Sequence, residues 1–214
     1  MAAKKVLTRA ESQALTRQAL LDAAEQMFHA SGYQATSIAA IAAEAGRTIG
    51  AVYSNFESKE ALCREVLRSR YMSEATKLLS ALMASGDSMD GRLEALSSWW
   101  MGLAADTSML VLGAEFLTST VRDSDQLPAN REFIERVKES GRVLFEDSLP
   151  EAVSAADPRI DDAIEAVVST GTGLAIAQAL GILDAERGAQ LIVSSLQMWF
   201  ARLSTPADDS VVPS

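Results

Sequence analysis

Apolar residues recur along most of the chain three and four positions apart, the spacing that places side chains on one face of an α-helix. The first such stripe contains Leu20, Ala24 and Phe28, and it ends at Gly32, because glycine readily adopts the left-handed conformation that closes a helix. No run of alternating β-branched residues bounded by turn residues is long enough to indicate a strand. The pattern therefore predicts an all-α protein.

Two short helices are predicted after this first helix, with Gly46 between them. Thr36 and Ser37 offer N-cap hydroxyls to one of them and Thr48 to the other, while Val52 is expected to face inward. Two short helices joined by a glycine-containing turn, with a longer helix on each side, form the arrangement of a helix-turn-helix DNA reader.

The remaining predicted helices are longer. Ser58 caps a helix over residues 59–84, which stops before Gly86 and is expected to bridge two domains. Further helices are expected at 89–104, 109–120, 129–149, 161–180 and 184–203, with proline only between or after them. The expected division is a helix-turn-helix domain at 1–57, a helical bundle at 58–205 and a disordered tail at 206–214.

Charge is distributed unevenly along the chain. The net charge of −10 argues against a nucleic-acid partner at first, because a phosphate backbone favours clustered Lys and Arg. Residues 1–70, however, hold nine Lys and Arg against seven Asp and Glu, whereas residues 71–214 hold ten against twenty-two. Only the first part of the chain is therefore expected to approach an anion.

The location expected for the protein is cytoplasmic. Its single cysteine, Cys63, cannot form an internal disulfide, and the N-terminal residues lack the apolar run of a secretory signal. The uncharged stretch 166–183 approaches the length of a membrane span, but it contains Thr170 and Gln178 and is flanked by Glu165 and Asp184. We expect a buried helix at a protein interface there, and no membrane partner.

A family resemblance supports the helix-turn-helix prediction. Residues 36–62 read TSIAAIAAEAGRTIGAVYSNFESKEAL, and residues 46–62 carry the pattern Gly-x-Thr-x-Gly-x-Val-Tyr-x-x-Phe-x-x-Lys-Glu-x-Leu. This segment, within the wider stretch 16–66, resembles the DNA-binding domain of the TetR (tetracycline repressor) family. The resemblance implies three helices in the DNA-binding domain and usually six more in a ligand-binding and dimerisation domain, which matches the predicted helices.

The resemblance also assigns roles to individual residues. It makes Thr36 and Ser37 donors to a DNA phosphate, and Lys59 another from the start of its helix, which agrees with the positive end of a helix dipole. The alternative for the hydroxyl residues is capping alone, and for Tyr53 it is a half-buried aromatic with its hydroxyl in water. The residues implied to face the groove or its walls are Thr48, Ile49, Gly50, Ala51, Tyr53, Ser54 and Asn55.

Arg47 departs from the family pattern, since its position in the turn often holds an apolar residue. Two interpretations are open. Either its stem packs while the guanidinium reaches a phosphate, or the turn differs locally.

The acidic part of the chain is expected to bind a ligand. Members of the family commonly hold a small apolar effector between the helices of this domain and release DNA when it binds, through a shift of the helix over residues 59–84. Apolar pockets with a few polar groups are the general form of such sites. No cofactor or metal is expected, and the candidate effector-binding residues are Trp99, Trp100, Met109 and Phe116.

The helix over residues 161–180 is apolar nearly all round, so it must be buried on two faces. One face would pack in its own subunit and the other, with the last helix, against a second copy around a two-fold axis. A homodimer of this kind predicts a palindromic operator. The residues expected at the interface are Val167, Val168, Gly171, Leu174, Ala175, Leu196, Trp199 and Phe200.

Two other classes of protein fit the sequence less well. An enzyme needs convergent acid, base, nucleophile or metal-binding groups, and neither the single histidine His29 nor Cys63 has such partners in the sequence. A helical interaction or signalling module would share the acidic bundle, but it does not explain the nearly uncharged surface expected around Tyr53. The favoured interpretation is a repressor, with activation left open.

Overall fold

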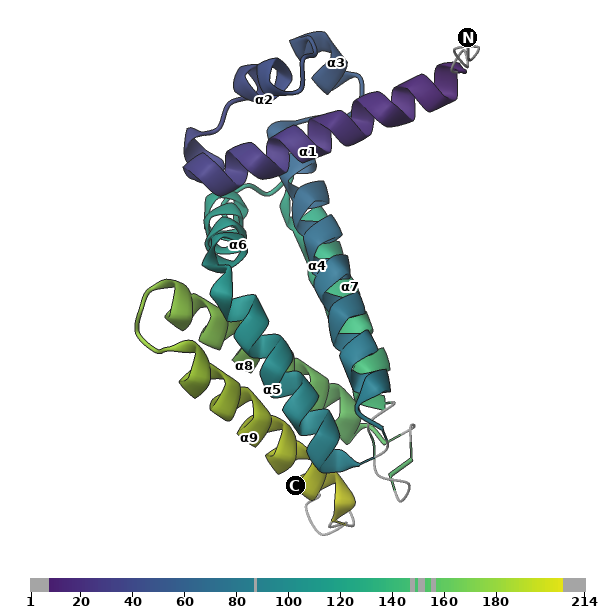
Figure 1. The fold of residues 1–214 in the computed structure, drawn as a ribbon, viewed down its shortest axis with the longest axis vertical. Helices are drawn as coiled ribbons and strands as arrows, with labels where there is room; N and C mark the ends of the chain where they lie inside the picture. The colour runs from purple at the N-terminus through teal and green to yellow at the C-terminus, as the bar shows by residue number, and fades with distance from the viewer. Residues whose placement is uncertain (1–7, 87, 147–148, 150–152, 155–156, 206–214) are drawn as a thin grey trace, which may run out of the picture. The chain divides into compact units, whose positions relative to one another are not determined.

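The computed structural model describes residues 8–86, 88–146, 149, 153–154 and 157–205. All regular secondary structure in this part of the chain is helical, which confirms the predicted all-α class (Figure 1). Across these same residues, no helix combines the length and the apolar character that crossing a membrane requires. The helices are α1 (Arg9–Ala35), α2 (Ile38–Glu44), α3 (Ile49–Tyr53), α4 (Lys59–Ala84), α5 (Met89–Ala105), α6 (Thr107–Thr120), α7 (Leu127–Glu146), α8 (Arg159–Ala179) and α9 (Ala185–Ser204).

Local signals set the helix ends. Helix α4 begins and ends at the predicted residues, and α5, α6, α8 and α9 differ from prediction by one or two. The predicted end of α7 at 149 follows residues 147–148, which lie outside the described part of the chain. The start of α1 was not predicted, although Thr8 and Glu11 form a capping box that the sequence itself displays.

Two compact units make up the chain. One contains Met1–Met72 with Ser108–Asn130, and the other contains Ser73–Thr107 with Arg131–Ser214. Helix α6 and the beginnings of α4 and α7 thus belong with α1, α2 and α3, a grouping that differs from the boundary placed at residue 57. The predicted domain roles stay predictions, and the predicted tail at 206–214 lies outside the described residues.

The first unit has its core where α1, α2, α3, α4 and α6 meet. Phe28 of α1 and Phe116 of α6 are both buried, and both rings contact Tyr33. Burial of such large side chains is the main favourable term in folding. The other fully buried large side chains of this unit come from four helices and are Leu20, Ile41, Val52, Leu62 and Cys63.

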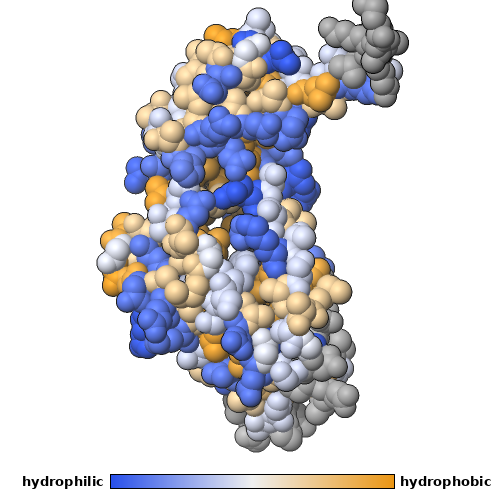
Figure 2. Space-filling view, viewed as in Figure 1, coloured by the Kyte–Doolittle hydropathy of each residue, from blue (hydrophilic) through white to orange (hydrophobic). Residues whose placement is uncertain are grey.

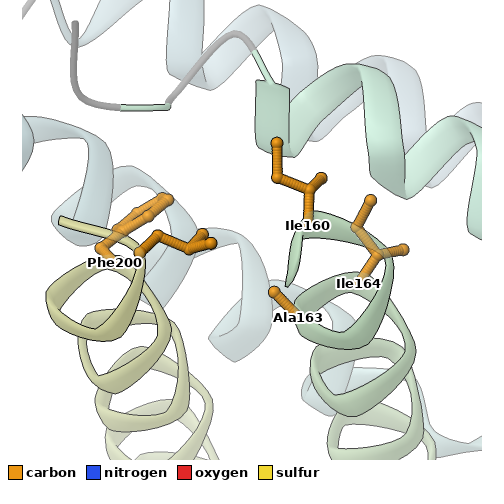
Figure 3. Packing of buried hydrophobic residues seen from close by; sticks show 5 residues of the cluster. Ile160, Ala163, Ile164 and Phe200 are labelled. Carbon is orange, nitrogen blue, oxygen red and sulfur yellow. The ribbon is translucent and has the colours of Figure 1, made fainter. Parts of the chain in front are cut away.

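The second unit is built on the antiparallel pair α8 and α9, with α5 packed against α9. Ile160, Ala163 and Ile164 of α8 form one buried cluster with Phe200 of α9 (Figure 3). A second buried cluster joins Trp100 of α5 to Ala189 and Ile192 of α9. The spacing of three or four residues within each helix places these side chains on one face.

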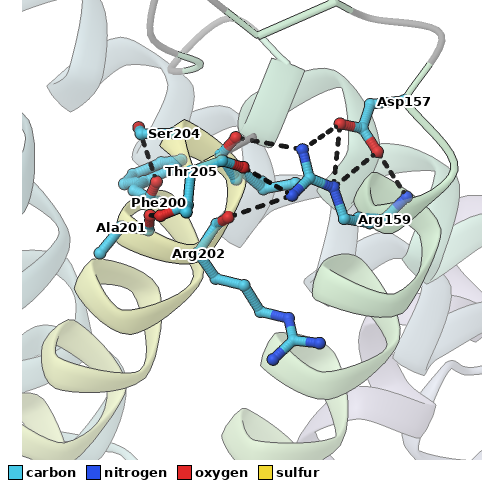
Figure 4. A network of polar contacts seen from close by, with 8 residues as sticks. Asp157, Arg159, Phe200, Ala201, Arg202, Ser204 and Thr205 are labelled. Atoms are coloured by element: carbon cyan, nitrogen blue, oxygen red, sulfur yellow. Dashed lines mark hydrogen bonds and ion pairs between the residues drawn. The ribbon is translucent and has the colours of Figure 1, made fainter. Parts of the chain in front are cut away.

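Arg159 ties the start of α8 to the end of α9 (Figure 4). Its guanidinium donates to the carbonyl oxygens of Arg202, Leu203 and Thr205 at 3.2, 3.2 and 2.9 Å, and it forms an ion pair with Asp157 at 2.6 Å. The last carbonyls of a helix have no partner within the helix, so a cation there satisfies them. One side chain therefore closes α9 and joins it to α8.

The residues predicted at a subunit interface pack at least partly within their own chain, and their place at an interface stays a prediction. Phe200 belongs to the buried α8–α9 cluster, and a Cβ built on Gly171 would already touch Ile192 and Trp100 at 3.7 Å. Periodicity shows that α8 is apolar on several faces, but it does not show which face its own subunit covers. The other predicted residues that pack on these two clusters are Val167, Val168, Leu174, Ala175, Leu196 and Trp199.

The residues predicted to bind an effector divide between the units. Trp99 and Trp100 lie in the second unit, where the indole N–H of Trp99 donates to the carbonyl oxygen of Glu74 at 3.1 Å. Met109 and Phe116 lie in the first unit, and the ring of Phe116 meets Tyr33 edge to face at 5.5 Å. Phe116 is therefore buried in the core beside α1, and its place in an effector site stays a prediction.

Candidate nucleic-acid interface

Helix α2 starts at the hydroxyl predicted to cap it. The side chain of Ser37 accepts a hydrogen bond from the backbone N–H of Ala40 at 3.1 Å. Ile41 and Ala42, one turn further on, are buried against the rest of the unit. Because Ser37 itself is exposed, the start of α2 faces solvent.

Thr36 neither caps α2 nor faces solvent, contrary to the prediction. Its side chain is 2% exposed and its hydroxyl lies 2.7 Å from the carbonyl oxygen of Gly32, to which it donates. Gly32 has a φ of 76°, which interrupts α1 and leaves carbonyl oxygens without helical partners. The Thr36 hydroxyl satisfies one of them, so it is not exposed to a phosphate.

The turn between α2 and α3 depends on Gly46, which has a φ of 62°. The N–H of Gly46 donates to the carbonyl of Ala43, and the N–H of Arg47 donates to the carbonyl of Ala42, at 3.0 and 2.8 Å. This pair of bonds is a Schellman motif, which needs a left-handed residue at the first position after the cap. Arg47 leaves the standard turn unchanged, and its side chain is exposed.

Helix α3 presents two faces. Thr48 caps it by accepting from the N–H of Ala51 at 3.1 Å, and Val52 and Phe56 are buried as predicted. On the other side, the side chain of Ile49 is 49% exposed and that of Tyr53 is 57% exposed. Gly50, beside them, is also exposed.

The polar residues after α3 bond mainly to its last turn. The Ser54 hydroxyl and the Asn55 amide both donate to the carbonyl oxygen of Ala51, at 2.9 and 2.8 Å. The Asn55 amide also lies 3.3 Å from the Ser54 hydroxyl oxygen. These bonds close the end of the helix, so the donors of Ser54 and Asn55 are engaged within the chain. The two residues remain predicted contacts, with Ser54 the more exposed of them.

Lys59 stands at the start of α4, which Ser58 caps through the N–H of Ala61 at 3.1 Å. The ammonium of Lys59 lies 3.5 Å from the carbonyl oxygen of Gln34 and 4.3 Å from the centre of the Tyr33 ring. A cation over an aromatic face is weakly attracted to it and keeps part of its hydration. The positive group is therefore held near the end of α1 and the beginning of α4.

Tyr33 connects several helices of the first unit, and sequence reasoning missed it. Its hydroxyl donates to the carboxylate of Glu60 at 2.7 Å, and its backbone N–H donates to the carboxylate of Glu115 at 2.7 Å. Burial, followed by the bond to Glu60, raises the pKa of Tyr33. Burial alone would raise the pKa of Glu60, but the bonds from Tyr33 and the backbone hold that pKa below its ordinary value. Only the aromatic character of Tyr33 after a helix-ending glycine hinted at this role.

Arg17, on α1, contacts the residues that follow α3 and the beginning of α4. Its guanidinium lies 4.7 Å from the centre of the Phe56 ring and 3.3 Å from the carboxylate of Glu65. Those contacts join α1, the end of the helix-turn-helix and α4. The charge of Arg17 is thus balanced inside the unit.

Comparison with known proteins identifies this arrangement. Residues 20–66 match the family model described as bacterial regulatory proteins, tetR family. No curated protein is significantly similar to the chain in sequence.

Solved structures share the fold over almost the whole chain. A candidate transcriptional regulator of Rhodococcus sp. RHA1 is 24% identical, with 89% of this chain and 100% of that chain covered and a TM-score of 0.71. A TetR-family transcriptional regulator of Streptomyces coelicolor is 18% identical, with coverages of 90% and 98% and a TM-score of 0.65. GusR of Salmonella enterica is 20% identical, with coverages of 93% and 99% and a TM-score of 0.64. The match over residues 20–66 identifies the helix-turn-helix described above as that of the bacterial regulatory proteins of the tetR family, and the solved structures show that their fold extends over the rest of the chain.

Proposed function

We propose that the protein binds a palindromic operator as a homodimer, represses transcription there and releases the DNA when a small apolar effector binds. The observation that carries this proposal is the outward face of α3, where Ile49 and Tyr53 stand exposed on a helix whose other side is buried. A side chain exposed in this way stabilises the fold little, but it is suited to contact base edges in a major groove.

Phosphate contacts would surround that face. We assign them to Ser37 at the start of α2, to Thr48, to the exposed guanidinium of Arg47 and to the ammonium of Lys59 at the start of α4. Helix N-termini present free N–H groups and the positive end of the dipole to an anion. Phosphate contacts position the protein on the duplex, and base contacts supply its sequence preference. Ile49, Gly50, Ala51, Tyr53, Ser54 and Asn55 form the proposed groove-facing set.

The proposed dimer uses the outward faces of α8 and α9. The side chain of Leu180 is 69% exposed and that of Met198 is 62% exposed, and hydrophobic surface is visible where α8 turns toward α9 (Figure 2). From residue 169 on α8 to residue 201 on α9, the only exposed charged positions cluster around the turn, at 184, 186 and 187. The face formed by these two helices is uncharged on a chain of net charge −10, which favours packing against a second copy of the chain. Its members are Ser169, Thr172, Gly173, Ile176, Leu180, Gln190, Ser194, Gln197, Met198 and Ala201.

A polar feature inside the second unit supports an effector site there. The indole N–H of Trp100 and the side-chain oxygen of Gln178 are buried without a hydrogen-bond partner, and both lie near the position that a Cβ of Gly188 would take, at 2.7 and 3.1 Å. Their residues are 4% and 9% exposed. Buried polar atoms without partners cost free energy, which a ligand group that bonds them would recover. We place the polar end of the effector beside Trp100.

The test is selection of bound duplexes from a random DNA library with the full-length protein, followed by affinity against salt concentration. We expect a palindromic sequence to be enriched. Lys59→Ala should weaken binding to every sequence and reduce the salt slope by about 2, because each subunit of the dimer loses one phosphate contact. Lys77→Ala, which removes an exposed lysine later in α4, is the matched control and should leave the slope unchanged.

Two further readouts separate the parts of the proposal. Transcription from a promoter that carries the selected operator should fall when protein is added, and a rise would indicate an activator. A library of apolar small molecules is then added to the protein–operator complex, and release by none of them would contradict the effector. If no duplex is enriched, the proposed sequence-specific DNA binding is wrong, and the alternative of a helical interaction module is favoured.

A further inference from the structure

Helix α3 lacks the side chains that usually recognise purines in a major groove. Arg and Lys pair with guanine, and Asn and Gln pair with adenine, through hydrogen bonds to two atoms of the base. None of these residue types occurs among Ile49–Tyr53. The base preference of this helix must therefore come from another kind of contact.

The polar residues that border α3 are engaged in capping it. The Thr48 hydroxyl oxygen accepts from the N–H of Ala51 at 3.1 Å. At the other end, Ser54 and the Asn55 amide donate to the Ala51 carbonyl at 2.9 and 2.8 Å. A side chain that caps its own helix is a poor partner for a base edge, because contact with the base would cost the cap.

What α3 offers outward is apolar and aromatic surface. Ile49 is 49% exposed and Tyr53, four residues later on the same face, is 57% exposed, whereas Val52 is fully buried. A single exposed isoleucine is ordinary on a protein surface. Ile49, however, lies on the face of α3 that is proposed to enter the major groove. Packing against DNA would remove its side chain from water.

Only one base presents an apolar group in the major groove, since thymine alone carries a C5-methyl group. We propose that Ile49 determines operator specificity by packing its branched side chain on the C5-methyl of one thymine in each half-site. The inference rests on the proposed DNA-binding function, and it names the base that the exposed isoleucine recognises. No charged or hydrogen-bonding group takes part in this contact. Removal of the thymine methyl group alone should therefore weaken binding.

The experiment replaces thymines of the selected operator by deoxyuridine, one symmetric pair at a time, which removes the methyl and keeps the base pair. Affinity is measured for the wild type, for Ile49→Ala and for Val121→Ala. For the wild type we expect one thymine pair at which deoxyuridine weakens binding by about fourfold per half-site, the value of one buried methyl group. With Ile49→Ala the same replacement should have no effect, because the partner of the methyl is gone.

Val121→Ala is the matched control, since Val121 is an exposed apolar residue of the same unit outside the helix-turn-helix, at 59% exposure. It should keep the deoxyuridine effect of the wild type. An equal penalty in Ile49→Ala and the wild type, or no sensitive thymine in an operator that is otherwise bound, overturns the assignment of Ile49 alone. Failure to enrich any duplex overturns the proposed function as well, so the two failures are distinguishable.

Discussion

The backbone N–H of Tyr33 and the carboxylate of Glu115 form a 2.7 Å hydrogen bond that joins α6 to the end of α1 within one compact unit. Gly32 makes room for it, because a Cβ there would lie 2.8 Å from a carboxylate oxygen of Glu115. Tyr33 continues the connection through its hydroxyl to Glu60 of α4. Three helices of the unit that carries the helix-turn-helix are therefore joined around one residue.

Gly32→Ala should destabilise the protein by about 1–3 kcal/mol, because it combines a left-handed backbone with a collision at Glu115. Gly46→Ala is the matched control, since Gly46 is also left-handed but has no atom within 4 Å of an added Cβ. It should cost only the backbone part, about 1 kcal/mol. Urea unfolding measures both. Adding Glu115→Ala to Gly32→Ala should cost less than the sum of the two single changes, because the carboxylate that collides is gone, and strict additivity would contradict this geometry.

Glu60 should make stability depend on acid pH. Its pKa is lowered in the folded state, mainly through the bond from Tyr33 acting against burial, so its contribution is present above the ordinary glutamate pKa and is lost as pH falls through the lowered one. The urea midpoint of the wild type should therefore drop toward acid pH more steeply than that of Glu60→Gln. Tyr33→Phe should raise the Glu60 pKa and move the loss to higher pH. Parallel curves for wild type and Glu60→Gln would show that other carboxylates account for the decline.

Cys63 should be unreactive in the folded protein. Its side chain is 0% exposed, and burial raises the pKa of its thiol to about 12, so little thiolate forms at neutral pH. Labelling with an aromatic disulfide reagent at pH 8 should be slow in buffer and fast in urea. The labelling rate should follow unfolding of the first unit, and rapid labelling without denaturant would contradict the packing of Cys63.

Gly173→Glu should separate the proposed dimer without unfolding the subunit. Gly173 is an exposed position of α8 with nothing within 4 Å of an added Cβ, so the new side chain finds space in the single chain. Across a two-fold contact it would bring two carboxylates together without partners. Gly102→Glu is the control, because Gly102 is also exposed, helical and open. Light scattering should show a lower mass for Gly173→Glu alone, and equal masses for both variants would place the interface elsewhere.

Gly188→Ala should destabilise the second unit by about 1–3 kcal/mol, as overpacking of a core does. The added Cβ would lie 2.7 Å from the indole nitrogen of Trp100. Gly171→Ala is the comparison, since its Cβ would make ordinary contacts at 3.7 Å and alanine favours a helix by about 1 kcal/mol over glycine. The midpoint temperature of thermal unfolding should fall for Gly188→Ala and rise for Gly171→Ala. A stabilising Gly188→Ala would show that Trp100 and Gln178 do not approach that position.

Several helix ends were determined by the sequence alone, because they depend on interactions between residues a few positions apart. The hydroxyls of Ser37, Thr48 and Ser58 each cap the helix predicted for them, and Gly46 forms the predicted turn. Helix α4 begins and ends where its cap and apolar spacing predicted. Capping and backbone conformation act within one turn, so they are readable in a short segment.

The tertiary structure decided which surfaces those helices bury. Thr36 and Ser37 are adjacent hydroxyl residues, yet the kink at Gly32 buries one and leaves the other at the surface. Helix α8 is apolar on several faces, and only its packing with α5 and α9 turns Gly171 inward and leaves Gly173 open. Tyr33 and Glu115 bond across 82 residues of sequence. Which surface a helix buries depends on which distant segment packs against it. A periodic pattern shows that a helix face is apolar, but it does not show which segment covers that face.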